Sequence, residues 1–209
     1  IFETGVFDNI IFDSRGIKKL NKFIEYMDDM KIVFPSFHGI VGYVYEKLIP
    51  PLERHQMGQF YTPPAIAELI AKFAIRNPGD VILDSGCGSG TFAIKAYEEL
   101  LRIKFRKDEA ECYNGINEHQ LVLDQIYAVD IHPFAAHITS IHLALMQPEC
   151  PTQKLNVLIK DFFDMDPNKF TFDAIIGNPP YTRWVEIPQE TQDRILSVLR
   201  PVIKKYDLT

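Results

Sequence analysis

The tetrapeptide Asn178-Pro179-Pro180-Tyr181 carries residue types well suited to chemistry, and it follows a short apolar run. Two consecutive prolines remove two backbone donors and fix two φ angles, so the carbonyl groups of this turn are held in set directions. The turn therefore combines rigid acceptors, one amide side chain and one aromatic ring. We interpret it as a ligand-binding turn.

A second candidate is the glycine-rich stretch DSGCGSG, residues 84–90. Its glycines allow a sharp turn at a strand end and close approach of the backbone to a ligand. The spacing is GxGxG, whereas a dinucleotide-binding fingerprint reads GxGxxG. Asp84, two residues before Gly86, would repel a pyrophosphate but attract the ammonium of an amino-acid-bearing cofactor, directly or through water. A helix-capping turn beside a surface acid is the alternative interpretation.

Two more acids occupy comparable positions further along the chain. Asp130 ends an apolar run, where such folds place a carboxylate that accepts the ribose hydroxyls of a ligand. Asp161 is a candidate acceptor for an exocyclic amine, and the neighbouring Phe162 could lie beside a flat base. Each residue alone is also compatible with a solvent-exposed acid or a core phenylalanine. Their order at consecutive predicted strand ends is the stronger signal.

The elements that must position these residues alternate between strands and helices. Short apolar runs predict strands at 81–84, 125–130, 155–161 and 172–178. Helical spacing of apolar residues predicts helices at 91–103 and 133–147. Near-continuous apolar strands between helices indicate a parallel sheet covered on both faces, hence a doubly wound, Rossmann-like α/β fold. Ligands of such sheets bind at the carboxyl ends of the strands.

Flanking segments complete this prediction. The charged stretch 104–120 interrupts the first crossover and is interpreted as a surface insertion. Residues 1–57 are predicted to form an N-terminal helical segment, and residues 58–209 the catalytic domain. Thr62 followed by Pro63 predicts the N-cap and first position of a helix.

Composition favours one α/β domain with an accessory segment, since the chain has 209 residues and is 46% hydrophobic. The sequence contains no apolar run of roughly eighteen residues and no signal-peptide pattern, so we expect a soluble, cytoplasmic protein that does not bind a membrane. The net charge of −6 is opposite to that of a self-sufficient nucleic-acid binder.

Cysteine and histidine spacing argues against a metal site. The cysteines are Cys87, Cys112 and Cys150. Their odd number and the lack of a CxxC pair argue against both a zinc site and a disulfide framework, and favour a reducing compartment. The histidines at positions 132, 137 and 142 recur every five residues, which spreads them around a helix.

Taken in order, the motifs GQFYTPP, DSGCGSGTF, AVDIHPFAA, KDFFD and IIGNPPYTR resemble those of S-adenosylmethionine-dependent adenine-N6 DNA methyltransferases. The resemblance covers about residues 40 to 185 and is nearest to type I modification subunits and fused restriction-methylation enzymes. It implies S-adenosyl-L-methionine as cofactor. The residues implied to bind it are Tyr61, Thr62, Asp84, Gly86, Gly88, Asp130, Ile131, Asp161, Phe162 and Asn178.

The resemblance also assigns chemistry to the Asn-Pro-Pro-Tyr turn. An adenine N6 amine is a poor nucleophile because its lone pair is delocalised into the ring. The side-chain oxygen of Asn178 and the carbonyl of Pro179, held by Pro180, would accept hydrogen bonds from the two amine hydrogens. These contacts would localise the lone pair on the nitrogen. Tyr181 would stack on a base flipped out of the duplex.

Double-stranded DNA is the implied substrate, and specificity and restriction subunits or a fused nuclease are the implied partners. The family pattern continues beyond the catalytic strand, whereas this sequence stops after a predicted helix at 189–209, so we expect a fold that is incomplete at its C-terminus. Other functions stay open at this point: methyltransferases of glutamine side chains and of RNA bases use related Asn-Pro-Pro motifs. The chain could also be a non-catalytic cofactor-binding module.

Overall fold

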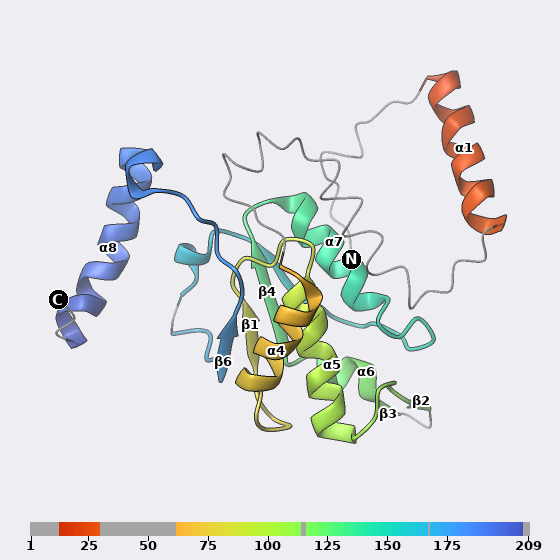
Figure 1. Cartoon of the computed structure of the whole chain (residues 1–209), viewed down its shortest axis with the longest axis horizontal. Coiled ribbons are helices and arrows are strands. Elements are labelled where there is room, and N and C mark those ends of the chain that lie inside the picture. The colour runs from red at the N-terminus through yellow and green to blue at the C-terminus, as the bar shows by residue number, and fades with distance from the viewer. Residues whose placement is uncertain (1–12, 30–61, 114–115, 167, 207–209) are drawn as a thin grey trace. The chain divides into compact units, whose positions relative to one another are not determined.

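The computed structural model describes residues 13–29, 62–113, 116–166 and 168–206. The chain divides into two compact units, residues 1–37 and 38–209. The described element of the first unit is helix α1, Ser14–Asp29, and all other described elements belong to the second unit (Figure 1). The domain boundary predicted between residues 57 and 58 lies outside the described residues.

A four-stranded parallel sheet forms the centre of the second unit, with strand order β5-β4-β1-β6. The strands are β1 (Ile82–Asp84), β4 (Ile126–Asp130), β5 (Asn156–Ile159) and β6 (Ala174–Ile176). Each lies within a predicted strand, and the parallel pairing confirms the predicted α/β fold class. Successive strands are added on one side of β1, first β4 and then β5, whereas β6 pairs with the other side of β1, as in doubly wound folds.

Among the described elements, three helices pack against the sheet. They are α4 (Pro64–Ala74), α5 (Thr91–Phe105) and α7 (Pro133–Ala144). Helix α5 contacts both α4 and α7, and all three contact strands, so they form one layer; α4 and α5 lie in front of the strands in Figure 1. Both predicted crossover helices are confirmed, and α7 begins with a proline as expected.

Strand register decides which side chains meet this layer. Ile82 pairs with Ile126 and Ala174, and all three contribute to the core beneath the helices. The next residues, including Tyr127 and Ile175, face the opposite side because side chains alternate along a strand. There the rings of Phe170 and Phe172 cover Tyr127, while Ile175 is 59% exposed. Within the described residues, this second face is covered less completely than the sequence predicted.

The predicted insertion contains a small hairpin, β2 (Cys112–Tyr113) and β3 (Ile116–Asn117), followed by helix α6 (Glu118–Leu123). The expectation of a surface segment is wrong for its last residues, because Glu118 to Gln120 are buried. His119 is fully buried between the hydroxyl of Tyr97, 2.7 Å from Nδ1, and that of Thr152, 3.1 Å from Nε2. Burial lowers the pKa of His119 to about 4, so its ring is neutral near pH 7.

Cys112 and Cys150 form a disulfide bond. The argument from an odd number of cysteines is therefore wrong for these two, because the third, Cys87, is a separate buried thiol. Burial raises the pKa of Cys87 well above its usual value, which makes that thiol a poor nucleophile.

Beyond the sheet, short 3₁₀ turns occupy Phe162–Asp164 and Trp184–Glu186. The predicted C-terminal helix is confirmed as α8, Gln189–Tyr206, which contains Pro201. None of the helices in the described ranges is long and apolar enough to cross a membrane.

Candidate active site at the carboxyl edge of the sheet

The carboxyl ends of the four parallel strands bring the predicted strand-end residues to one edge of the sheet. Asp84 and Asp130 are the last residues of β1 and β4. Asp161 and Asn178 follow the ends of β5 and β6 by two residues each. Since parallel strands end at the same edge, four segments that are far apart in the sequence contribute polar groups to one region.

Asp84 is the most unusual of these groups. It is 1% exposed, and neither carboxylate oxygen has a hydrogen-bond partner among the described residues. Burial raises its pKa to about 7, because a desolvated carboxylate is disfavoured in its charged form. The nearby amides of Gly86 and Ala93 oppose this rise, and the charge of Asp130 adds to it. A buried acid whose oxygens lack a hydrogen-bond partner in the described ranges fits the ammonium group of an amino-acid-bearing cofactor.

Asp130 fastens the glycine loop to the end of β4. Its Oδ2 accepts the backbone amide of Gly88 at 2.9 Å, and its Oδ1 accepts that of His132 at 2.8 Å. The amide of Cys87 donates to the carbonyl of Val129 at 3.0 Å. Each carboxylate oxygen can accept a further hydrogen bond, so these contacts leave Asp130 able to bind ribose hydroxyls. Asp130 therefore stabilises the position of the glycine loop, which a solvent-exposed acid would not do.

Sequence reasoning missed two residues of α7 that support the same loop. The Thr139 hydroxyl donates to the carbonyl of Gly88 at 2.9 Å. His142 places Nδ1 2.7 Å from the carbonyl of Ser89, and because a carbonyl only accepts, Nδ1 carries the proton. The apolar pattern of α7 predicted a helix, but it gave no sign of which polar residues face the loop. The loop is thus held by side chains from β4 and from α7.

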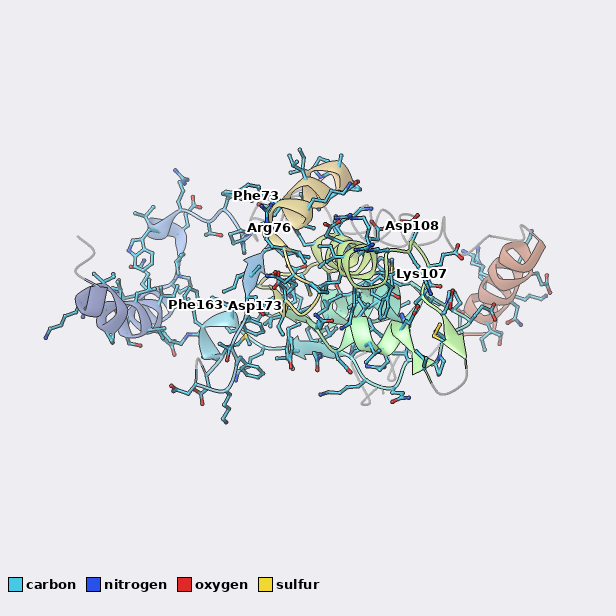
Figure 2. All side chains as sticks on the ribbon, turned by 90° about the horizontal axis from the view of Figure 1, so that it is seen from below. Phe73, Arg76, Lys107, Asp108, Phe163 and Asp173 are labelled. Carbon is cyan, nitrogen blue, oxygen red and sulfur yellow. A yellow bond between two sulfur atoms is a disulfide. The ribbon has the colours of Figure 1, made fainter. Side chains whose placement is uncertain are left out.

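Asp161 is shared between two contacts. Its Oδ1 accepts the amide of Phe163 at 2.9 Å, and its Oδ2 accepts a hydrogen bond from Arg194 of α8. Arg194 also lies 3.2 Å from Asp164. Phe163, labelled in Figure 2, packs edge-on against Phe162, which is 37% exposed. Asp161 is therefore paired with an arginine, which sequence reasoning did not predict because the two residues are 33 positions apart.

Asn178 contacts the start of α4. Its Nδ2 donates to the Thr62 hydroxyl oxygen at 3.0 Å. The predicted role of Thr62 as N-cap is wrong, because Pro63 occupies that position and no described side chain caps the helix. Gly177 brings the turn close to β1, since a methyl group added there would lie 3.4 Å from an Asp84 oxygen. The Asn-Pro-Pro turn therefore lies beside the buried acid.

The remaining predicted site residues are more exposed to solvent. Pro179 and Pro180 are exposed, Tyr181 is 68% exposed and Ile131 is 60% exposed. Gly86 and Gly88 are half-buried in the loop. Tyr61 lies outside the described residues. A group of three or more metal-binding side chains is absent from the described part of the chain.

The sheet order, the glycine loop after β1 and the carboxylate at the end of β4 define a Rossmann-like α/β domain with a candidate ligand site at its carboxyl edge. Residues 37–204 match the sequence model of the family described as N-6 DNA Methylase. The chain belongs to this family.

Individual relatives agree with this assignment. The chain is 30% identical over 171 residues to the type I restriction enzyme MjaIX methylase subunit of Methanocaldococcus jannaschii, covering 78% of this chain and 26% of that protein. It is 24% identical over 165 residues to the type I restriction enzyme EcoEI methylase subunit of Escherichia coli, covering 78% and 31%. The chain thus spans about a third or less of these relatives.

A solved structure shows the same fold. It is the modification subunit of a putative type I restriction enzyme from Vibrio vulnificus, which aligns with a TM-score of 0.50 at 16% identity. The alignment covers 94% of this chain and 37% of that one.

Proposed function

We propose that this chain carries the catalytic part of an adenine-N6 DNA methyltransferase that uses S-adenosyl-L-methionine and acts in a restriction-modification system. One observation carries the proposal. The buried carboxylate of Asp84, whose oxygens have no hydrogen-bond partner in the described part of the chain, lies next to the Asn-Pro-Pro turn, where a methyl group on Gly177 would be 3.4 Å from it. A site for the amino-acid end of the cofactor would thus adjoin the groups that hold the target amine.

The residues at the carboxyl edge of the sheet are proposed to contact different parts of the cofactor. Asp84 would bind the cofactor ammonium, which supplies the partner that its oxygens lack among the described residues. Gly86 and Gly88 would let the backbone approach the same end, and Asp130 with Ile131 would contact the ribose. When bound, the cofactor supplies an electrophilic methyl group on a sulfonium centre.

At the adenine end of the proposed cofactor site, Asp161 would accept the exocyclic amine and Phe162 would contact the base. The hydrogen bonds to Phe163 and Arg194 use part of the capacity of Asp161, and a carboxylate offers about four acceptor positions. The family resemblance implies that Tyr61 and Thr62 close the methionine end.

On the substrate side, the Asn178 oxygen and the Pro179 carbonyl would accept the two hydrogens of the adenine N6 amine. Pro180 stiffens the turn, and the exposed Tyr181 would stack on the flipped base. Localising the amine lone pair in this way raises its nucleophilicity without a covalent intermediate.

The proposed substrate is double-stranded DNA, and the proposed partners are specificity and restriction subunits or a fused nuclease. Such a function belongs to the cytoplasm, where cellular DNA is accessible in a bacterium or archaeon. The acidic net charge of −6 suggests that the surface that reads DNA is supplied elsewhere in the assembly.

The proposal is tested by methyl transfer from labelled cofactor in the complete enzyme, with DNA, RNA and a glutamine-containing protein as separate substrates. Asn178→Ala should lower the single-turnover rate on DNA by about 10²–10³-fold, because one preorganised acceptor is lost. Cofactor affinity should change little, since the amide faces the target amine.

Tyr181→Ala and Tyr181→Phe provide the matched comparison. Loss of stacking in the alanine variant should weaken DNA capture by roughly 1–3 kcal/mol, whereas phenylalanine keeps the ring and should retain much of the activity. Transfer at the wild-type rate by Asn178→Ala would refute the proposed chemistry and favour a non-catalytic module. Labelling of RNA or protein in place of DNA would reassign the substrate.

A further inference from the structure

Thr62 and Asn178 occupy equivalent backbone positions, because each precedes two consecutive prolines. The residue before a proline is restricted to extended conformations, and each proline fixes its own φ angle. The two side chains therefore project from stiff segments of the chain. A hydrogen bond between them joins two anchored groups, although the residues are 116 positions apart.

The hydroxyl of Thr62 serves this contact and not the helix that follows. Helix α4 begins after Pro63 without a side-chain cap from the described residues. The Asn178 amide donates through Nδ2 at 3.0 Å, in a half-buried setting. With Nδ2 turned toward Thr62, Oδ1 points away from it, and Oδ1 accepts no hydrogen bond from the described residues.

We infer that Thr62 is a positioning residue that holds the carboxamide of Asn178 with its oxygen toward the target amine. The inference rests on the proposed methyltransferase function and deepens it. It gives Thr62 a task on the substrate side of the site, whereas the family resemblance implies contact with the methionine end of the cofactor.

Orientation matters because the two ends of a carboxamide have opposite hydrogen-bonding roles. The terminal torsion of asparagine is broad and roughly two-fold, so an untethered amide can present either its oxygen or its NH₂ group. An amine hydrogen needs the oxygen as acceptor, and the NH₂ group would repel it. A hydroxyl that accepts from Nδ2 favours the productive orientation before the base arrives.

The test uses the complete enzyme with saturating cofactor and DNA in single-turnover methyl transfer. Thr62→Val removes the hydroxyl at nearly constant volume and should slow transfer by about 10–100-fold, as expected when a reacting contact is misplaced. Cofactor affinity, measured by calorimetry, should stay unchanged. Thr62→Ser restores the hydroxyl and should recover most of the rate.

Two further variants complete the design. Thr171→Val makes the same chemical change at an exposed position away from the sheet edge and should transfer at the wild-type rate. Thr62→Val combined with Asn178→Ala should be no slower than Asn178→Ala alone, because the hydroxyl acts through the amide. Thr62→Ala replaces the valine variant if thermal unfolding shows that valine disrupts the turn.

Three outcomes decide the inference. An unchanged rate in Thr62→Val, alongside a slow Asn178→Ala, overturns the positioning role but leaves the proposed function intact. Weakened cofactor binding with an unchanged saturated rate also overturns it and assigns Thr62 to the cofactor. A wild-type rate in Asn178→Ala instead refutes the proposed function itself.

Discussion

At the scale of single residues, Asp84 links protonation to stability and, in the proposed function, to cofactor binding. Its pKa is raised to about 7 by burial, above that of an unfolded carboxyl. The folded state therefore holds this proton more tightly, so the stabilising contribution is complete below about pH 4 and is lost as the pH rises through about 7. Above pH 7 the folded protein contains a buried charge that lacks a hydrogen-bond partner among the described residues.

We predict that Asp84→Asn stabilises the cofactor-free protein at pH 8 by on the order of 1–3 kcal/mol, because the buried charge is removed. The difference from wild type should shrink towards pH 5. Urea unfolding at both pH values measures it, with Asp108→Asn at an exposed position as the control. The same variant should bind the cofactor more weakly, since a neutral amide replaces the partner of the ammonium. Lower stability at pH 8 would show that the carboxylate has a cation partner in the free protein.

At the scale of elements, the junction between the glycine loop and α5 depends on Gly90. Gly90 has a φ of +88°, which non-glycine residues rarely adopt. A Cβ atom there would lie 2.9 Å from the Thr139 hydroxyl oxygen and 3.3 Å from the Thr139 Cα. Only a residue without a side chain lets the loop lie this close to α7.

We predict that Gly90→Ala destabilises the domain by about 1–3 kcal/mol, since the backbone conformation alone has a cost of this order. Gly79→Ala is the matched control, because a Cβ there meets nothing within 4 Å. The control should be neutral or slightly stabilising. Guanidinium unfolding of both variants provides the comparison, and equal midpoints would mean that the loop relaxes around the added methyl group.

Periodicity predicted the four strands of the parallel sheet and the helices α5 and α7, because it reports which residues are buried, and burial along one element is a local property of the sequence. It did not predict β2, β3 or α6. The contacts that complete the site are not local. Thr139 and His142 are recognisable only once α7 lies beneath the glycine loop. The pairing of Arg194 with Asp161 depends on how α8 returns to the end of β5. A local capping rule likewise failed for Thr62, because its hydroxyl accepts a hydrogen bond from Asn178, which lies 116 positions later in the sequence.

At the scale of the whole molecule, the order of strand-end motifs predicted the parallel sheet correctly, because parallel topology follows from alternating strands and helices. The cover of the second sheet face was not predictable from strand hydrophobicity. Ile175 is as apolar as a core residue yet 59% exposed. An apolar strand shows that cover is needed, but it does not show which segment supplies it.

The disulfide between Cys112 and Cys150 closes a covalent ring, with 38 positions separating its ends. The ring contains β4 and α7, and therefore Asp130, but it excludes the glycine loop and the Asn-Pro-Pro turn. In the chain-entropy description, such a ring restricts the denatured ensemble and contributes roughly 3–4 kcal/mol.

Reduction should consequently lower the melting temperature by on the order of 10 °C, while cofactor affinity at 25 °C stays unchanged because the folded site keeps its contacts. Thermal unfolding and calorimetry with and without reductant test both parts, and Cys112→Ser with Cys150→Ser reproduces the reduced state permanently. A loss of affinity on reduction at that temperature would mean that the ring also shapes the native state. If affinity is preserved, the redox environment of the cell would change how long the protein stays folded without changing how it binds the cofactor.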